Sequence, residues 1–156
     1  MQRREFFKTL GTVAAVAAVA TPTMTFAAAP VSANQMSYEN ALSAITGGKT
    51  PKESSAIKLK APEIAENGAV VPITVEVDSP MTDADYVKSI HIIAGKNGNA
   101  RCIDVHLTPA NGKAMFATRI KLGGTQKVSA IVGLSNGDFL IASQSVKVTI
   151  GGCGWF

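Results

Sequence analysis

The sequence has little of what usually assigns an activity. It contains no phosphate-binding loop, internal repeat, heptad pattern or low-complexity run. Charge of one sign is also scarce, since the 156 residues carry a net charge of +4 and the basic residues are spread along the chain. Because nucleic-acid binding needs a concentrated basic patch, that class of function is not indicated. The length is enough for one domain with a sizeable core.

A long hydrophobic run is missing too. The apolar stretch from about Leu10 to Ala20 is roughly half the length that a membrane span needs. Paired arginines, Arg3-Arg4, precede it with two phenylalanines and a lysine, which resembles a twin-arginine export motif. We predict a signal peptide over residues 1–33, cleaved between about 27 and 33, and a periplasmic protein without a membrane anchor. A general secretory signal is the alternative. Cleavage removes three basic residues and one acidic residue, so the net charge falls from +4 to +2.

The next segment, residues 34–55, is predicted to be a short helix and a linker. A helix is expected over about 38–46, because Ser37 is a suitable N-cap and Gly47-Gly48 would end it. From Ala56 onward the composition changes to short β-branched runs. The segment 56–150 is therefore treated as the folded domain.

Period-two alternation of apolar and polar residues predicts about seven strands in this domain. The predicted strands lie near 57–60, 71–77, 86–94, 103–107, 113–122, 128–134 and 138–150. Four Asn-Gly pairs, beginning at Asn67, Asn97, Asn111 and Asn136, indicate hairpin turns. Pro72 cannot donate a ladder hydrogen bond, so its strand is expected at an edge or with a bulge. The fold class is all-β, an immunoglobulin-like antiparallel β-sandwich.

One predicted strand is apolar on both faces. The stretch Ser129–Leu134 offers apolar side chains to both sides, whereas a lone sandwich normally covers only one side of each sheet. We therefore expect a second subunit to cover the other face.

The chemistry is expected in the last six residues, 151–156. Gly151, Gly152 and Gly154 flank Cys153 and would give it backbone freedom, which predicts a mobile tail that carries a thiol into a pocket of another protein. A free cysteine has a pKa of about 8.5, and the tail offers no cation to lower it. Activation would therefore come from the receiving pocket, and no catalytic residue is assigned to this chain.

Three stretches resemble the SoxY family: Val148–Gly154, Ala61–Gly68 and Val77–Lys88. The resemblance covers essentially the whole mature chain. It implies a carrier protein, not an enzyme, that holds thiosulfate and sulfane sulfur covalently on Cys153 and needs no other cofactor. It also implies a heterodimer with SoxZ and three enzyme partners. The c-type haem enzyme SoxXA would load thiosulfate as an S-thiosulfonate, the hydrolase SoxB would release sulfate, and in some organisms a sulfur dehydrogenase would oxidise the remaining sulfur.

Two features depart from the family pattern. The chain ends in Trp155 and Phe156, whereas SoxY proteins normally end in glycines. These aromatics are candidate docking anchors for partner enzymes, because aromatic residues often dominate binding energy; they could instead block a narrow pocket or have no role. The second departure is Cys102, since the family relies on the tail cysteine alone.

Cys102 raises two alternatives, a disulfide and a metal site. In an exported protein it could form a disulfide with Cys153. It alternates with Asp104 and His106 on one strand face, away from Ile103, but the spacing along a strand is too wide for three residues to bind one metal ion. His91 and His106 are expected as surface or hydrogen-bonded histidines.

The alternative functions are a periplasmic metal or redox chaperone with Cys153 as a soft ligand, and a structural domain whose tail adds a strand to a neighbour.

Overall fold

The predicted helix opens the part of the chain that the structure describes. The computed structural model describes residues 35–152, and α1 spans Tyr38–Thr46. The Ser37 side chain accepts a hydrogen bond from the backbone N–H of Asn40 at 3.2 Å, which caps the first turn. Gly47 ends the helix with a left-handed φ of 63°. The helix prediction and both caps are confirmed.

All seven predicted strands are present, and two short strands are added. They are β1 (Lys52–Glu53), β2 (Ile57–Lys60), β3 (Ile64–Asn67), β4 (Val71–Val77), β5 (Val87–Ala94), β6 (Arg101–His106), β7 (Ala114–Ile120), β8 (Gln126–Leu134) and β9 (Phe139–Ile150), with a 3₁₀ turn η1 (Pro109–Asn111) before β7. The added strands, β1 and β3, are short and mostly polar, so no alternating pattern marked them.

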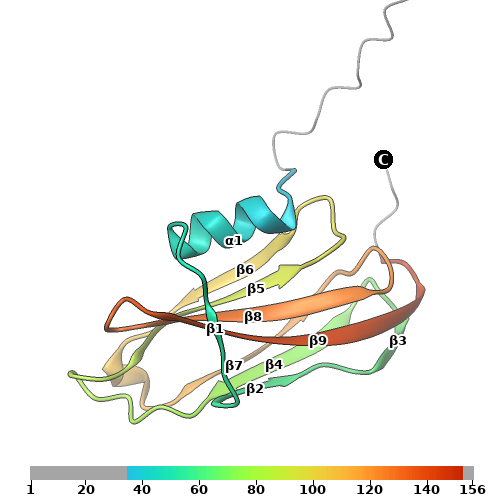
Figure 1. Ribbon diagram of the computed structural model, residues 1–156. Helices are drawn as coiled ribbons and strands as arrows, with labels where there is room; N and C mark the ends of the chain where they lie inside the picture. Colours follow the sequence, from blue (N-terminus) through green and yellow to red (C-terminus); the bar gives the residue numbers. More distant parts are fainter. Residues whose placement is uncertain (1–34, 153–156) are drawn as a thin grey trace, which may run out of the picture. The chain divides into compact units, whose positions relative to one another are not determined.

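Two sheets form the sandwich (Figure 1). One contains β1-β9-β8-β5-β6, with β3 also paired to β9, and the other contains β2-β4-β7. The pairing is antiparallel except at β9, which takes β1 and β3 as short parallel partners. The immunoglobulin-like sandwich class is confirmed. Within residues 35–152, no helix is long and apolar enough to cross a membrane.

Pro72 lies in the central strand of the smaller sheet, not in an edge strand. It pairs with Arg119 on β7, while the pairing of β2 with β4 ends opposite Thr74. The pairing with β2 covers only Thr74 to Val77, so at Pro72 strand β4 is paired with β7 alone. The edge prediction therefore holds locally, at the residue that cannot donate a ladder hydrogen bond.

The four Asn-Gly pairs do not all form hairpins. Asn97-Gly98 joins β5 to β6 and Asn136-Gly137 joins β8 to β9, and both are connections between paired strands. The pairs that begin at Asn67 and Asn111 instead lead from one sheet to the other. An Asn-Gly pair marks a change of direction, but whether the next strand pairs depends on contacts distant in sequence.

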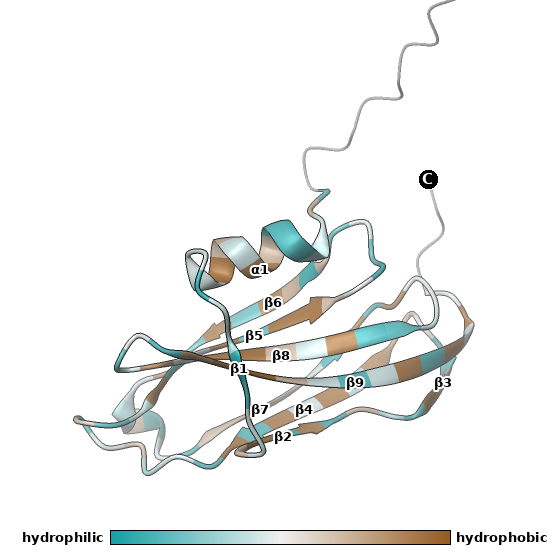
Figure 2. Cartoon of the chain, viewed as in Figure 1, coloured by the Kyte–Doolittle hydropathy of each residue, from teal (hydrophilic) through white to brown (hydrophobic). Residues whose placement is uncertain are grey.

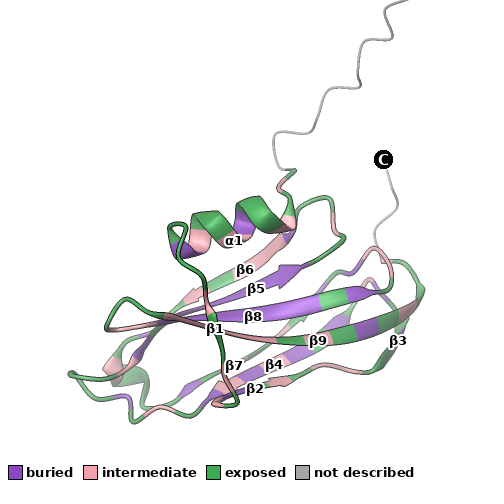
Figure 3. Cartoon of the chain, in the orientation of Figure 1, coloured by how far each residue is buried: buried purple, intermediate pink, exposed green. Residues whose placement is uncertain are grey.

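The main core lies between the two sheets. Val71, Ile73, Val75 and Val77 of β4 face it with at most 5% of their surface exposed, which confirms the predicted alternation. Strand β8 is buried on both faces (Figure 3). Its inner side chains enter this core, and its outer side chains enter a second cluster.

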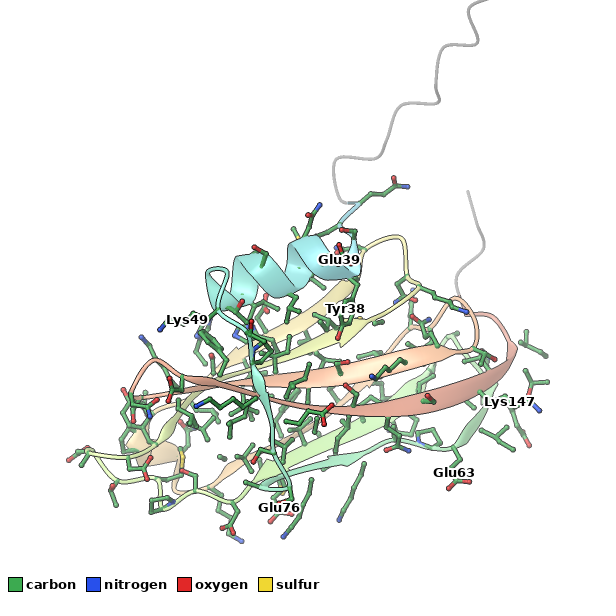
Figure 4. The ribbon with its side chains drawn as sticks, in the orientation of Figure 1. Tyr38, Glu39, Lys49, Glu63, Glu76 and Lys147 are labelled. Carbon is green, nitrogen blue, oxygen red and sulfur yellow. The ribbon has the colours of Figure 1, made fainter. Side chains whose placement is uncertain are left out.

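The helix α1 covers the second face of β8, and this corrects the expectation that a partner subunit does so. The second cluster joins Ala41 of α1 to Ile93 and Ile131 of the sheet, all fully buried. Figure 2 shows the hydrophobic parts of β5 and β8 beneath the helix. The Tyr38 side chain points from α1 towards the sheet (Figure 4), and its hydroxyl lies 3.0 Å from Oγ of Ser129. The apolar pattern required cover, and this chain supplies it.

Candidate functional site

The predicted carrier tail follows β9, and the structure describes only its first two residues. Cys153, Gly154, Trp155 and Phe156 lie outside the described residues, as does the predicted signal peptide over 1–33. The assignments of the attachment thiol and of the docking anchor therefore stay predictions. Gly151 and Gly152, called the tail root below, are described.

Backbone hydrogen bonds hold the tail root to two connections of the sandwich. The N–H of Gly152 donates to the carbonyl oxygen of Leu122 at 2.9 Å. The N–H of Leu122 donates to the carbonyl oxygen of Gly68 at 2.7 Å, and the N–H of Gly68 donates to the carbonyl oxygen of Ile150 at 2.7 Å. The tail root thus lies against Gly68-Ala69, between β3 and β4, and Leu122-Gly123, between β7 and β8. We call these four residues the cradle.

Three glycines are needed here because the backbones approach closely. A Cβ at Gly152 would overlap the backbone of Gly68 and Ala69, and a Cβ at Gly151 would lie 2.5 Å from the carbonyl oxygen of Gly123. A Cβ at Gly68 would overlap the carbonyl of Leu122 and lie 2.8 Å from the nitrogen of Gly152. None of the three has a positive φ, so space and not conformation requires glycine.

That Gly151 and Gly152 give the tail its flexibility stays a prediction. The structure adds a second role, close contact with the cradle. Gly68 was missed as a site residue. Its signal was its position at the end of Ala61–Gly68, one of the stretches that resemble SoxY, but sequence alone does not show that this glycine meets the tail.

Two exposed apolar side chains adjoin the tail root and the cradle in the chain, and a third lies further along β3. Ile150 at the end of β9 is 67% exposed, Val70 after the cradle is 55% exposed, and Ile64 on β3 is 59% exposed. Lys147 and Glu63 lie at the same β3–β9 pairing (Figure 4), where the N–H of Lys147 donates to the carbonyl oxygen of Glu63 at 2.9 Å. The tail therefore leaves the sandwich from a surface with both apolar and charged groups.

Cys102 lies on β6, beside the main core. It is partly buried, packs against the main core and carries a free thiol. Nδ2 of Asn97 lies 3.8 Å from its sulfur. Burial raises the pKa of Cys102 to about 11, although hydrogen bonds from Asn97 and the Ala94 backbone oppose that rise. A thiol with so high a pKa is a poor nucleophile at neutral pH.

A β-bulge corrects the predicted orientation of Cys102. Ile92 of β5 pairs with Ile103, but the next residue, Ile93, pairs with Arg101, so Cys102 has no partner on β5. An extra residue of this kind changes the direction of a side chain. Cys102 therefore packs with the core side of β6 and not on the face of Asp104, as strict alternation had indicated.

The remaining polar residues of β5 and β6 form a hydrogen-bonded cluster. Nδ1 of His91 lies 2.5 Å from Oδ1 of Asp104, and Nε of Arg101 donates to both carboxylate oxygens at 3.0 and 2.8 Å. Burial lowers the pKa of His91 below 6.5, with partial opposition from Asp104. Burial would raise the pKa of Asp104, but the hydrogen bonds from His91 and Arg101 outweigh it and lower that pKa. Among the described residues, no group of three potential ligands could hold a metal ion.

The sequence also contains one Gly-x-Ser-x-Gly match, Gly133–Gly137, which the sequence analysis overlooked. It lies at the β8–β9 hairpin, where Gly137 has a φ of 86°. Oγ of Ser135 accepts a hydrogen bond from the backbone N–H of Tyr86 at 3.2 Å. A nucleophile elbow requires a strand-to-helix turn, so this match is a turn and not a catalytic site.

Comparisons with known proteins give a consistent result. The family model described as "Sulfur oxidation protein SoxY" matches residues 42–153. The solved sulfur carrier protein SoxY from Chlorobium limicola f thiosulfatophilum is 34% identical with a TM-score of 0.60, covering 72% of this chain and 96% of that one. The superoxide reductase (neelaredoxin) from Ignicoccus hospitalis is 19% identical with a TM-score of 0.54, covering 73% of this chain and 94% of that one, and shows the fold alone. No curated protein matches the sequence.

Residues 42–153 include the sandwich, the cradle and the tail root, so the family match spans more than half of the chain. The Chlorobium relative supports the same family at 34% identity. This chain belongs to the SoxY family of sulfur oxidation proteins.

Proposed function

We propose that this protein is a covalent carrier of sulfur intermediates in thiosulfate oxidation and that the thiol of Cys153 holds the cargo. The observation that carries the proposal is the SoxY family match, which extends to Cys153 itself. The Chlorobium relative is described as a sulfur carrier protein. In this proposal the chain is a substrate of partner enzymes and not an enzyme.

The described geometry supports a tail thiol attached close to a fixed point. Gly152 is hydrogen-bonded to Leu122, and Cys153 is the next residue. Covalent geometry keeps the two Cα atoms about 3.8 Å apart. The cargo would therefore be attached one residue beyond an anchored backbone, at a surface that exposes Ile150.

The proposed loading step is a two-electron oxidation. The Cys153 thiol loses its proton, a bond forms between its sulfur and the terminal sulfur of thiosulfate, and two electrons pass to the haem partner, SoxXA. In the second step SoxB hydrolyses the bond between the two cargo sulfurs. Water supplies the fourth oxygen of sulfate, and the sulfane sulfur stays on Cys153 as a persulfide.

Cys102 is a poor alternative for this chemistry. Its pKa is raised to about 11 by burial, and its sulfur contacts Asn97 inside the β5–β6 hairpin. Loading requires the thiolate and access to a partner's pocket. The two cysteines therefore divide into a shielded thiol and a proposed carrier thiol.

The proposal includes the family's partners and compartment. We propose a heterodimer with SoxZ and contacts with SoxXA, SoxB and, where present, a sulfur dehydrogenase. The paired arginines Arg3-Arg4 support twin-arginine export to the periplasm. Since α1 already covers the second face of β8, that face no longer argues for SoxZ, and the heterodimer now depends on family membership.

Mass mapping tests the proposal directly. The purified SoxZ complex would be incubated with thiosulfate and the haem enzyme, and peptide adducts would be mapped. We expect a thiosulfate adduct on Cys153, its loss in Cys153→Ser, and nearly unchanged loading in Cys102→Ser. Adducts that persist in Cys153→Ser would exclude Cys153 as the attachment site. A bound metal in place of a sulfur adduct would favour the chaperone alternative.

A further inference from the structure

We infer that Asn97 is a positioning residue for the carrier tail, which it fixes through the connection between β7 and β8. The consequence for loading rests on the proposed carrier function. The geometry does not, because it concerns only residues between Gly68 and Gly152 that the structure describes.

The Asn97 side chain clamps one stretch of backbone from both ends. Its Nδ2 donates to the carbonyl oxygen of Lys121 at 2.8 Å, and its Oδ1 accepts from the N–H of Gly123 at 3.0 Å. Leu122 lies between these two residues and is fully buried. A single amide thus fixes the backbone on both sides of Leu122.

A buried glutamine supports this clamp. Gln126 is 4% exposed, and its Nε2 donates to Oδ1 of Asn97 at 2.9 Å and to the carbonyl oxygen of Gly124 at 3.1 Å. Its Oε1 accepts from the N–H of Lys96 at 2.7 Å. The β5–β6 hairpin and the β7–β8 connection are therefore joined by a network with both donors and acceptors satisfied.

Leu122 transmits this constraint to the tail root. Its carbonyl oxygen accepts the N–H of Gly152 at 2.9 Å, and its own N–H donates to Gly68 at 2.7 Å. Gly123, which is bonded to Asn97, is also the residue whose carbonyl faces Gly151. Two hydrogen bonds, at the N–H of Gly123 and at the carbonyl oxygen of Leu122, thus connect Asn97 to Gly152. The two residues are 55 positions apart in the sequence.

A fixed tail root limits the entropy that insertion into a partner must remove. Each residue that becomes free must be ordered again on docking, at a cost equivalent to about fivefold or more in affinity. Release of Gly151 and Gly152 would therefore weaken productive docking. The chemistry in the partner's pocket would be unchanged once the thiol is bound.

Three variants of the full chain in its SoxZ complex test the inference. Asn97→Ala removes both ends of the clamp, and Asn97→Asp keeps an acceptor for Gly123 but loses the donor to Lys121. Asn136→Ala is the matched control, because its Asn-Gly pair also joins paired strands and, among the described residues, its side chain forms hydrogen bonds only with Asp138 in its own turn. Amide hydrogen exchange of Gly152 and the steady-state kinetics of thiosulfate loading would be measured for each.

We expect the Gly152 amide to exchange at least about tenfold faster in Asn97→Ala, with an intermediate change in Asn97→Asp and none in Asn136→Ala. The KM for the carrier should rise about fivefold to 25-fold in Asn97→Ala, with unchanged kcat. Unchanged Gly152 exchange in Asn97→Ala overturns the inference, as does a fall in kcat with unchanged KM.

If Asn97→Ala does not fold, Asn97→Asp decides the question through the same two measurements. Amide exchange of Gly152 is measured without a sulfur cargo, so the positioning role of Asn97 and the carrier function of Cys153 are tested separately. Faster Gly152 exchange without any adduct on Cys153 would remove the carrier function and leave the structural role of Asn97 intact.

Discussion

The helix-covered face of the large sheet and the tail root are held together in opposite ways. Between α1 and the sheet, large side chains such as Ile93 and Ile131 fill the space and exclude water. At the tail root, Gly152 lies against Gly68 and Gly151 lies against Gly123, with no side chains between the backbones. One region is stabilised by apolar volume, and the other by hydrogen bonds that only the absence of a Cβ permits.

This difference predicts different sensitivities. The stabilisation from apolar burial is proportional to the buried area, and part of it is lost when a side chain is shortened. Close backbone contact is lost when a side chain is added. Substitutions of opposite kind should therefore damage the two regions. The first two of the following four experiments test that contrast, and the other two measure smaller polar contributions in the large sheet.

The largest effect is expected from shortening a side chain under the helix. Ile131→Ala should lower the free energy of unfolding by about 2–5 kcal/mol, because Ile131 is fully buried in the cluster with α1. Ile64→Ala is the control, since Ile64 is 59% exposed and should change stability by less than about 0.5 kcal/mol. Urea unfolding measures both. Equal effects would show that α1 does not protect this face.

Adding a methyl group to the cradle should have the next largest effect. Gly68→Ala should cost about 1–3 kcal/mol, because the new Cβ would overlap the carbonyl of Leu122 and crowd Gly152. Gly98→Ala is a closely matched control: Gly98 also follows an asparagine, and no atom of the described residues lies within 4 Å of the added Cβ. Urea midpoints compare the two, and equal midpoints would mean that the cradle yields without cost.

A polar contact under the helix should contribute less. Tyr38→Phe removes a hydroxyl that lies 3.0 Å from Oγ of Ser129, which in turn lies 2.8 Å from Oγ of Ser143. We expect a loss of about 0.5–1.5 kcal/mol. A double-mutant cycle with Ser129→Ala isolates the pair. Additive losses would indicate that the contact contributes nothing beyond packing.

The smallest effect is expected from mild acid. His91 is 5% exposed and has a lowered pKa, so the unfolded chain binds its proton more readily than the folded protein does. Stability should therefore fall as pH drops below about 6.5, towards the lowered folded pKa. Asp104 adds a further loss only below pH 3.8, since its folded pKa is also lowered.

His91→Gln should remove the pH dependence of unfolding between pH 6.5 and 5, and His106→Gln serves as the control because His106 also lies on this part of the sheet. Urea unfolding at several pH values gives the slopes. A slope that survives in His91→Gln would assign the titration to another group.

Elements whose signals are local could be predicted from the sequence. The helix over 38–46 was predictable because Ser37 and Gly47 act on backbone within one turn of themselves. Strands such as β4 and β7 were predictable because a strand with one buried face must alternate. The family was also recognisable from the tail sequence around Cys153 together with two internal stretches.

What covers each face of the large sheet and what contacts the tail root depend on the three-dimensional packing of segments distant in sequence. The apolar pattern of β8 required cover on both sides, but α1 and a second subunit satisfy that pattern equally well. The bulge at Cys102 depends on the register of β5 against β6, which strict alternation along one strand does not contain. The hydrogen bonds that link Gly68, Asn97 and Gly152 run through Leu122 and Gly123. These residues are far apart in the chain and meet only where the connections of the sandwich come together. A glycine needed for space and a glycine needed for flexibility have the same letter, and only the atoms around it distinguish them.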